Sequence, residues 1–284
     1  MRPLAEWSRE DRRQLIGVFT DIDDTLTTEG AITPQALQAL GALKAAGLHV
    51  IAITGRPIGW CAPFAQGDAA QGLQPWPVDA LVAENGAVAF CLPNLRVNEL
   101  EANKGVLEQL LKIYQQNPQT RADNLAKMQT VVAQVLLEVP GALCAQDSAG
   151  RETDIAIDHS EFSHLSPGEI AQVVAILQNA GMTATVSSIH INGWFGAHNK
   201  LEGARWIVQT LFDRDLDAER QRWAFVGDST NDQLMFEHFE HSVGVANVRR
   251  FEAALAHTPR FITPSERGAG FAEAAAAILQ AHAP

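Results

Sequence analysis

Three carboxylates stand within four positions of the stretch VFTDIDDTLTTEG (residues 18–30), directly after an apolar run. Asp21, Asp23 and Asp24 carry like charges, and crowding like charges is unfavourable in a folded chain unless a cation lies between them. Asp21 and Asp23 are two positions apart, so in extended backbone their side chains point to the same side. Carboxylate oxygens are ligands that Mg²⁺ prefers, and protein-bound Mg²⁺ often contacts a substrate phosphate as well. The stretch therefore indicates a site for Mg²⁺ and a phosphate group.

Three further polar clusters stand at or after apolar runs later in the chain. They are Thr54, Gly55 and Arg56; Lys200; and Asp228, Asn231 and Asp232 of GDSTND (227–232). The hydroxyl of Thr54 and the backbone N–H groups around Gly55 can donate hydrogen bonds to an anion. Lys200 would offset negative charge and hold a phosphoryl oxygen. The carboxylates of GDSTND would add hard oxygen ligands to those of the first stretch.

The elements expected to position these clusters alternate between strand and helix. Apolar runs predict strands at 15–23, 48–54, 80–86, 223–229 and 242–247, and helical patterns follow Thr33 and cover 199–211, 231–239 and the last residues. Such alternation predicts a doubly wound, Rossmann-like parallel sheet in an α/β fold. Ligands of such sheets bind beyond the carboxyl ends of the strands. The four polar clusters are therefore expected to meet in one crevice.

The middle of the chain has a different pattern. It predicts helices at 99–116 and 121–138, a half-exposed strand at 151–158, a helix opened by the capping box SPGE (166–169), and a strand at 183–191. We interpret residues 90–188 as an inserted α+β cap domain. Residues 1–89 and 189–284 would then form the catalytic core.

The composition of the chain excludes some classes of binding partner and of site. The 284-residue chain has a formal net charge of −12, which argues against nucleic acid and anionic membranes, because both require a basic surface. Its three cysteines have no CxxC spacing, so neither a disulfide framework nor a zinc site is indicated. MRPLAEWSREDRRQL is too charged for a signal-peptide core, and no apolar run is long enough to span a bilayer. We expect a cytoplasmic protein, and the sequence leaves its oligomeric state open.

The motifs DIDDT, ITGRP, a later lysine and GDSTND, in that order, resemble the four motifs of the haloacid dehalogenase (HAD) superfamily of phosphohydrolases. The insertion between the second and third motifs, together with ENGA (84–87), resembles the Cof-type sugar-phosphatase branch with a large α/β cap. The chain is also similar to sucrose-phosphate and mannosylphosphoglycerate phosphatases. Two positions depart from the pattern: Asp24, where the branch usually carries Gly, and Asn199, just before the lysine.

This resemblance implies roles for individual residues. Asp21 would be the nucleophile that forms an aspartyl-phosphate, and Asp23 the acid and base that serves the leaving group and then the attacking water. The metal set would be Asp21, Asp23 and Asp228, supported by Asn231 and Asp232. Phosphate would be bound by Thr54, Gly55, Arg56 and Lys200, with a structural ion pair as the alternative role of Arg56. His190, Asn192, His198, Arg151 and Asp154 are further candidates for substrate contact.

The expected function is Mg²⁺-dependent hydrolysis of a small phosphate ester, with sugar phosphates as the expected class. A phosphotransferase or phosphomutase on the same scaffold is an alternative, because nothing in the motifs excludes transfer to another hydroxyl. A second alternative is a receiver-type signalling module, which also holds a phosphorylated aspartate and Mg²⁺ on a doubly wound sheet. Asp23 and the large insertion count against it. A DxD glycosyltransferase is disfavoured by Lys200 and GDSTND.

Overall fold

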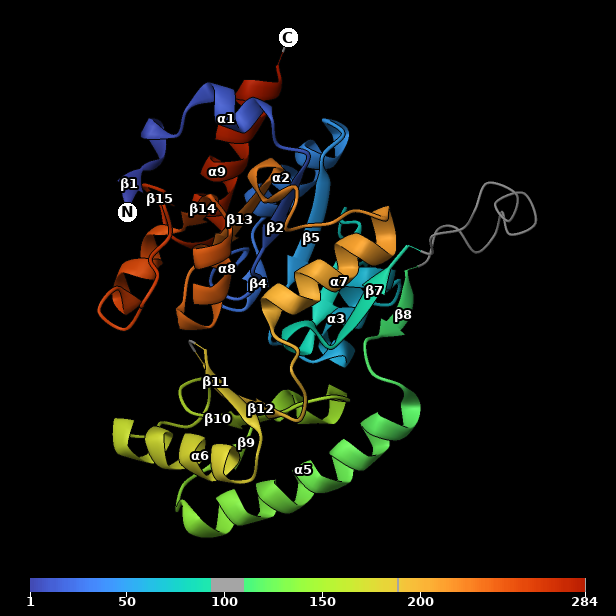
Figure 1. Ribbon diagram of the computed structural model, residues 1–284, viewed down its shortest axis with the longest axis vertical. Coiled ribbons are helices and arrows are strands. Elements are labelled where there is room, and N and C mark those ends of the chain that lie inside the picture. Colours follow the sequence, from blue (N-terminus) through green and yellow to red (C-terminus); the bar gives the residue numbers. More distant parts are fainter. Residues whose placement is uncertain (93–109, 188, 284) are drawn as a thin grey trace, which may run out of the picture.

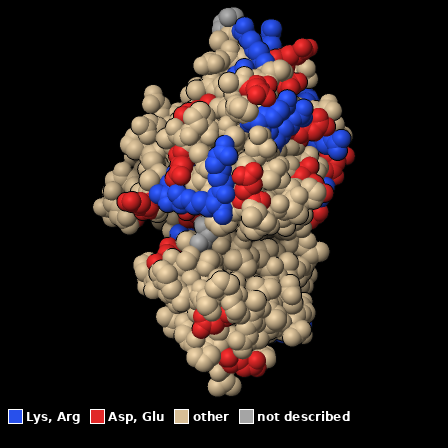
Figure 2. Space-filling model, turned by 90° about the vertical axis from the view of Figure 1, so that its left-hand side faces the viewer, with Lys and Arg blue, Asp and Glu red and all other residues tan. Residues whose placement is uncertain are grey.

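The computed structural model describes residues 1–92, 110–187 and 189–283. Figure 1 shows a larger sheet with helices on both of its faces and, at one end of it, a smaller sheet covered by two helices. Figure 2 shows that acidic and basic side chains intermingle over the larger-sheet part, while the smaller part shows few charged side chains on this face.

Within the described residues the larger sheet has nine strands, in the order β1-β15-β14-β13-β2-β5-β6-β7-β8. Neighbouring strands are parallel from β1 to β6, whereas β7 and β8 add an antiparallel edge. Their bounds, in sheet order, are Arg2–Pro3, Phe261–Ile262, His241–Gly244, Trp223–Gly227, Gly17–Thr20, His49–Ile53, Ala80–Ala83, Val88–Cys91 and Leu111–Tyr114. This mainly parallel sheet confirms the predicted α/β fold class.

Helices cover both faces of this sheet because its central strands are apolar on both sides. Val18 and Val50 face one core cluster, while the adjacent Phe19 and Ile51 face the other, as the alternation of strand side chains requires. The first face carries α2 (Pro34–Ala45), α3 (Ile58–Gln66) and α9 (Arg267–His282), and α1 (Arg9–Arg13) packs on α9. The second face carries α7 (Lys200–Phe212) and α8 (Gln233–His238). The core is therefore doubly wound.

The helix starts follow from the capping residues read in the sequence. Thr33 accepts a hydrogen bond from the backbone N–H of Ala36, and Pro34 opens α2 at a position where its missing N–H costs nothing. The Asn199 side chain accepts from the N–H groups of Leu201 and Glu202 and so caps α7. Asn199, which departs from the family pattern, therefore fixes the helix end that carries Lys200.

The smaller sheet is antiparallel, in the order β11-β12-β10-β9. Its strands are Thr183–Val186, His190–Trp194, Ile155–Asp158 and Leu143–Cys144, and it is covered by α5 (Pro118–Glu138) and α6 (Pro167–Asn179). Figure 1 places both helices on the side of this sheet that is turned away from the larger sheet. The other side of the smaller sheet faces the carboxyl ends of the core strands.

The two sheets divide the chain differently from the predicted boundaries at 90 and 188. β8 (Leu111–Tyr114) pairs with β7 in the larger sheet, whereas β12 (His190–Trp194) pairs in the smaller one. We call residues 115–198, which connect β8 to α7, the cap segment. The predicted helix at 99–116 is wrong at its C-terminal end, because 111–114 are strand. The part at 99–109 lies outside the described residues.

Among the described residues, no helix combines the length and apolarity needed to cross a membrane.

Two glycines allow α7 to approach the loop after β6. A Cβ on Gly203 of α7 would lie 2.5 Å from the Cα of Gly86, which ends the short helix η2 (Glu84–Gly86). Gly86 itself has a φ of +106°, a conformation that favours glycine. This close contact sets the distance between Lys200, at the start of α7, and the strand ends.

We expect Gly203→Ala to lower the free energy of unfolding by about 1–3 kcal/mol, because the added methyl group would meet backbone that cannot move aside. Gly168→Ala in the first turn of α6 is the matched control, because the nearest atom to its new Cβ lies 3.9 Å away. Urea unfolding of both variants measures the difference. Equal stability of Gly203→Ala and wild type would show that the contact is not limiting.

Candidate active site

The four predicted clusters meet at one edge of the larger sheet. Asp21 follows β2, Thr54 follows β5 and Asp228 follows β13, and these three strands are adjacent and parallel. Lys200 is the first residue of α7 and reaches the same edge. The parallel topology therefore brings together residues that lie up to about two hundred positions apart, as the sequence pattern predicted.

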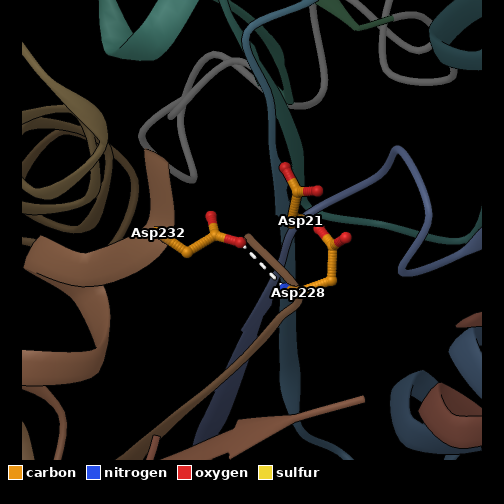
Figure 3. A group of neighbouring side chains, drawn as sticks. All are labelled: Asp21, Asp228 and Asp232. Atoms are coloured by element: carbon orange, nitrogen blue, oxygen red, sulfur yellow. Dashed lines mark hydrogen bonds between the residues drawn. The ribbon is translucent and has the colours of Figure 1, made fainter. Parts of the chain in front are cut away.

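The centre of the site is a group of three buried carboxylates around one ammonium group. Lys200 Nζ lies 2.6 Å from Oδ1 of Asp21 and 2.7 Å from Oδ1 of Asp232. Asp21, Asp228 and Asp232 each offer a carboxylate oxygen within 4.8 Å of the others, and all three are buried (Figure 3). The group therefore contains more negative than positive charge.

Burial makes this arrangement unfavourable in the ionised form. It raises the pKa of Asp21 to about 8, although Lys200 beside it acts in the opposite direction. Burial also raises the pKa of Asp228 well above its ordinary value, and the nearby Asp21 and Asp232 add to the increase. A divalent cation between the carboxylates would favour their ionised forms.

Asp232 holds the loop that carries Asp228. Its Oδ2 accepts hydrogen bonds from the backbone N–H of Asp228 at 2.9 Å and of Ser229 at 3.3 Å, while its Oδ1 is held by Lys200. Asn231 accepts a hydrogen bond from the Ser229 hydroxyl at 2.8 Å. Because both oxygens of Asp232 have protein partners, its geometry suits the supporting role rather than direct metal binding.

The donor set fits Mg²⁺. Asn247 donates to Oδ2 of Asp228, and among the described residues none donates a hydrogen bond to the buried Oδ1. The carboxylates of Asp228 and Asp21 are hard oxygen ligands that lie close enough together to bind the same ion. The carboxylate of Asp23, the third predicted ligand, lies outside this group and is held by Arg56.

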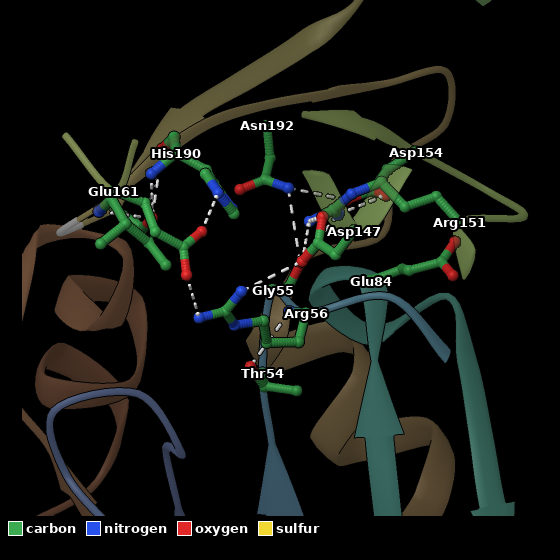
Figure 4. Close-up of polar contacts among 12 residues, drawn as sticks. Thr54, Gly55, Arg56, Glu84, Asp147, Arg151, Asp154, Glu161, His190 and Asn192 are labelled. Atoms are coloured by element: carbon green, nitrogen blue, oxygen red, sulfur yellow. Dashed lines mark hydrogen bonds and ion pairs between the residues drawn. The ribbon is translucent and has the colours of Figure 1, made fainter. Parts of the chain in front are cut away.

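Arg56 is one of the residues at which the core and the cap segment meet. Its Nε donates to both oxygens of Asp23, at 3.0 and 3.1 Å. Its two terminal nitrogens donate to Asp147 and Glu161 of the cap segment, each at 3.1 Å (Figure 4). The side chain is 8% exposed. The structure thus gives Arg56 an ion-pair network, and no contact here tests its predicted binding of phosphate.

The loop at Thr54 and Gly55 is also held from the cap segment. The Gly55 carbonyl accepts hydrogen bonds from Arg151 at 3.0 Å and from Asn192 at 3.4 Å. The Thr54 hydroxyl accepts from the backbone N–H of Arg56 and lies 3.5 Å from Oδ2 of Asp23. The cap segment therefore fixes the backbone of the second motif as well as the side chain of Arg56.

A small chamber lies between the core motifs and the cap segment. Its volume is about 20 Å³, and it is lined by Asp21, Asp23, Thr54, Gly55, Arg56, Ser187, Ile189, His190, Asn192, Ser229 and Asn231. A site for one water needs about 10–15 Å³. The structure therefore describes a closed conformation, in which the cap segment covers the carboxylates. His190 and Asn192 line the chamber as candidate contacts, whereas His198 stacks on Trp194 elsewhere.

The sequence analysis did not single out three acidic residues of this region. They are Asp147, Glu161 and Glu84, the last of which was noted only as part of the motif ENGA. Glu84 is fully buried and accepts hydrogen bonds from the N–H of Ile58 in the core and from Glu152 and Thr153 in the cap segment. It has a φ of +49° and is followed by Asn85, at +53°, and by Gly86. The Asn-Gly pair within ENGA was the available signal, because both residues tolerate left-handed backbone.

Asp24 also has left-handed backbone, with a φ of +53°, which explains why glycine suits this position. Its carboxylate lies 3.0 Å from Nε of Arg267 at the start of α9. Asp24 therefore takes part in an ion pair beside the site rather than in the carboxylate group around Lys200.

The sequence model of the haloacid dehalogenase-like hydrolases matches residues 18–130. No curated protein matches the chain in sequence.

Solved structures share the fold at low identity. The sucrose-phosphatase of Synechocystis sp. PCC6803, solved with sucrose and phosphate, is 18% identical with a TM-score of 0.62, and the match covers 94% of this chain and 98% of that one. A putative HAD/Cof-like hydrolase from Plasmodium vivax is 16% identical with a TM-score of 0.63, covering 96% and 99%. A HAD subclass IIB sugar phosphatase is 16% identical with a TM-score of 0.58, covering 94% and 98%.

The matched segment contains the first two motifs, and the shared fold extends over the cap segment and the motifs that follow it. Residues 18–130 thus resemble the haloacid dehalogenase-like hydrolases in sequence, and the described structure shares its fold with a sucrose-phosphatase and a putative HAD/Cof-like hydrolase.

Proposed function

We propose that the protein is a Mg²⁺-dependent phosphatase of a small phosphorylated metabolite, with sugar phosphates as the substrate class. The observation that carries this proposal is the buried group of Asp21, Asp228 and Asp232 around Lys200, placed against a chamber that Thr54 and Ser229 line. Such a site concentrates positive charge and hydrogen-bond donors where a phosphoryl group would lie once the cation is bound.

Asp21 is the proposed nucleophile. Its carboxylate oxygen forms a bond to phosphorus while the bond from phosphorus to the ester oxygen breaks, which gives an aspartyl-phosphate. Lys200 donates a hydrogen bond to Oδ1 of Asp21, and Asp21 lines the chamber. Asp23 donates a proton to the departing alkoxide and then takes one from the water that hydrolyses the aspartyl-phosphate.

Asp21 and Asp228 are the side chains proposed to hold Mg²⁺, because their carboxylate oxygens lie close together, and Asp23 stays a predicted ligand. When bound, the ion would neutralise the carboxylates and the phosphate and draw negative charge from the phosphoryl oxygens. Asp232 would keep Asp228 in place through the backbone of the loop.

The cap segment is proposed to close over the substrate, to exclude bulk water and to contact the organic part of the ester. Ser187, His190 and Asn192 are polar residues of this segment that line the chamber, and such groups suit the hydroxyls of a sugar. The sucrose-phosphatase that shares this fold was solved with sucrose and phosphate, which supports the class of substrate.

A phosphomutase or phosphotransferase on the same scaffold would pass the phosphoryl group of the aspartyl-phosphate to a sugar hydroxyl instead of water. Measuring free phosphate against isomerised sugar phosphate distinguishes these reactions.

We expect Mg²⁺ to raise the melting temperature of the protein by about 5 °C at a hundred times its Kd, since the ion binds only the folded state. Asp228→Asn should remove most of this shift, because Asp228 supplies the unpartnered oxygen. Asp123→Asn, an exposed carboxylate on α5, is the control and should keep the shift. A shift that persists in Asp228→Asn would place the ion elsewhere.

A screen of phosphorylated metabolites with phosphate release as the readout tests the function itself. Asp21→Asn should lower turnover by about 10³-fold or more while the protein stays folded, because the nearly isosteric amide cannot attack phosphorus. Chelation of divalent ions should abolish activity in the wild type. The proposal fails if the wild type releases phosphate from no ester, or if Asp21→Asn keeps a tenth of the wild-type rate.

Asp23→Asn should slow the first chemical step on a sugar phosphate by about 10²-fold or more, which is the usual contribution of a general acid. An aryl phosphate should be less affected, because its leaving group needs no proton. Single-turnover measurements on both esters separate this step from hydrolysis of the aspartyl-phosphate. Equal losses on the two esters would remove Asp23 from the role of acid.

A further inference from the structure

Arg56 joins the proposed acid to the cap segment through a single side chain. Its Nε bridges the two oxygens of Asp23, while its two terminal nitrogens reach Asp147 and Glu161. The guanidinium also lies over the ring of Trp60, with its carbon 5.2 Å from the ring centroid. A planar fork held on three sides has little freedom to rotate, so it fixes the carboxylate that it bridges.

Both cap carboxylates are themselves held in place. Glu161 lies within a tight turn in which the Asp158 carboxylate accepts backbone hydrogen bonds from residues 160 to 163. Its second oxygen lies 2.8 Å from Nε2 of His190. The position of Glu161 is therefore set by the fold of the cap segment rather than by Arg56.

Asp147 is fixed from the other side of Arg56. It lies in the short helix η3 (Gln146–Gly150) and shares its carboxylate between Arg56 and Arg151. Arg151 in turn donates to the carbonyl of Gly55, the residue before Arg56. The contact between Arg56 and Asp147 thus depends on the same closure of the cap segment that holds the second motif.

We propose that Arg56 is a positioning residue for Asp23, and that Asp147 and Glu161 of the closed cap segment hold Arg56 in that role. The proton donor of the reaction would then be aligned only when the cap is closed over a substrate. This inference rests on the proposed function. It assigns to two cap residues an effect on the chemical step, although neither lies in any of the four motifs.

Two other roles for Arg56 predict different results. If Arg56 bound the phosphoryl group, its loss would slow aryl and sugar phosphates alike, because both carry the same group. If the network served only to stabilise the fold, its loss would lower the melting temperature without changing the preference between esters. An effect through Asp23 should appear only where the leaving group needs a proton.

The test compares the first-step rate on an aryl phosphate, p-nitrophenyl phosphate, with the rate on the sugar phosphate that the wild type hydrolyses best. The ratio of the aryl-phosphate rate to the sugar-phosphate rate is measured in single turnover. The variants are Arg56→Lys, the double variant Asp147→Asn with Glu161→Gln, and Asp23→Asn as the reference. Arg56→Lys keeps the charge but loses the fork, and the double variant leaves Arg56 intact.

Glu152→Gln is the matched control. Glu152 also forms an ion pair between the cap segment and the larger sheet, with Lys112 of β8, but it has no contact with Arg56 or Asp23 among the described residues. Its ratio should stay within about twofold of the wild type, as expected for a partly exposed ion pair. Thermal unfolding of every variant is recorded with the rates.

We expect the ratio to rise by about tenfold or more in Arg56→Lys and in the double variant. This rise is a part of the full general-acid contribution expected to be lost in Asp23→Asn. Unchanged ratios in folded variants, or equal losses on both esters, would overturn the inference and leave the proposed function standing. If Arg56→Lys fails to fold, the single variants Asp147→Asn and Glu161→Gln decide by the same criterion. A wild type that hydrolyses no ester would overturn both.

Discussion

The structure depends on three carboxylates buried against a single lysine. Asp21, Asp228 and Asp232 are each less than 5% exposed, and Lys200 contacts two of them. Burial of such charges is strongly unfavourable unless they are paired and hydrogen-bonded. Three features hold this arrangement: the parallel sheet, the helix-capping residue Asn199 before α7, and the loop after β13. A divalent metal ion, once bound, would supply the missing positive charge.

Backbone details of the core follow from that requirement. Lys200 must enter between two strand ends, so α7 begins at the Asn199 cap and approaches the loop after β6 through Gly203 and Gly86. Asp232 uses one oxygen for Lys200 and the other for the backbone of its own loop. The Asp232 side chain therefore holds both the ammonium group of Lys200 and the backbone of the loop that carries Asp228.

A second set of charges lies one layer further out, between the core and the cap segment. Arg56 and Arg151 are both buried, and Arg56 contacts carboxylates from both parts of the protein. Arg151 contacts carboxylates of the cap segment and the Gly55 carbonyl of the core. Burial alone would lower the pKa of Arg151, but the neighbouring carboxylates of Asp154 and Asp147 outweigh burial and raise it. Glu84 adds backbone hydrogen bonds from both parts. Buried charged groups of both parts therefore make the contact between the core and the cap segment.

The sequence by itself determined the α/β class and the convergence of the four motifs. Long apolar runs alternating with helical patterns admit few arrangements, and parallel strands place their carboxyl ends at one edge. Local capping residues, such as Thr33, fixed the helix starts. The edge strand β8 was missed, since a four-residue strand carries little periodic signal and its pairing with β7 is a tertiary contact.

Only the tertiary structure decided which carboxylates share the cation site and which serve other partners. Alternation along an extended chain placed Asp21 and Asp23 on the same side, but the chain turns after β2, and Arg56 draws the carboxylate of Asp23 away from Asp228. Asp147 and Glu161 carry no local pattern that marks them, because their role comes from a guanidinium that lies about a hundred positions earlier in the chain. The spacing of the motifs predicts which strand ends meet. Which charged side chain pairs with which depends on side-chain directions that only the packed structure fixes.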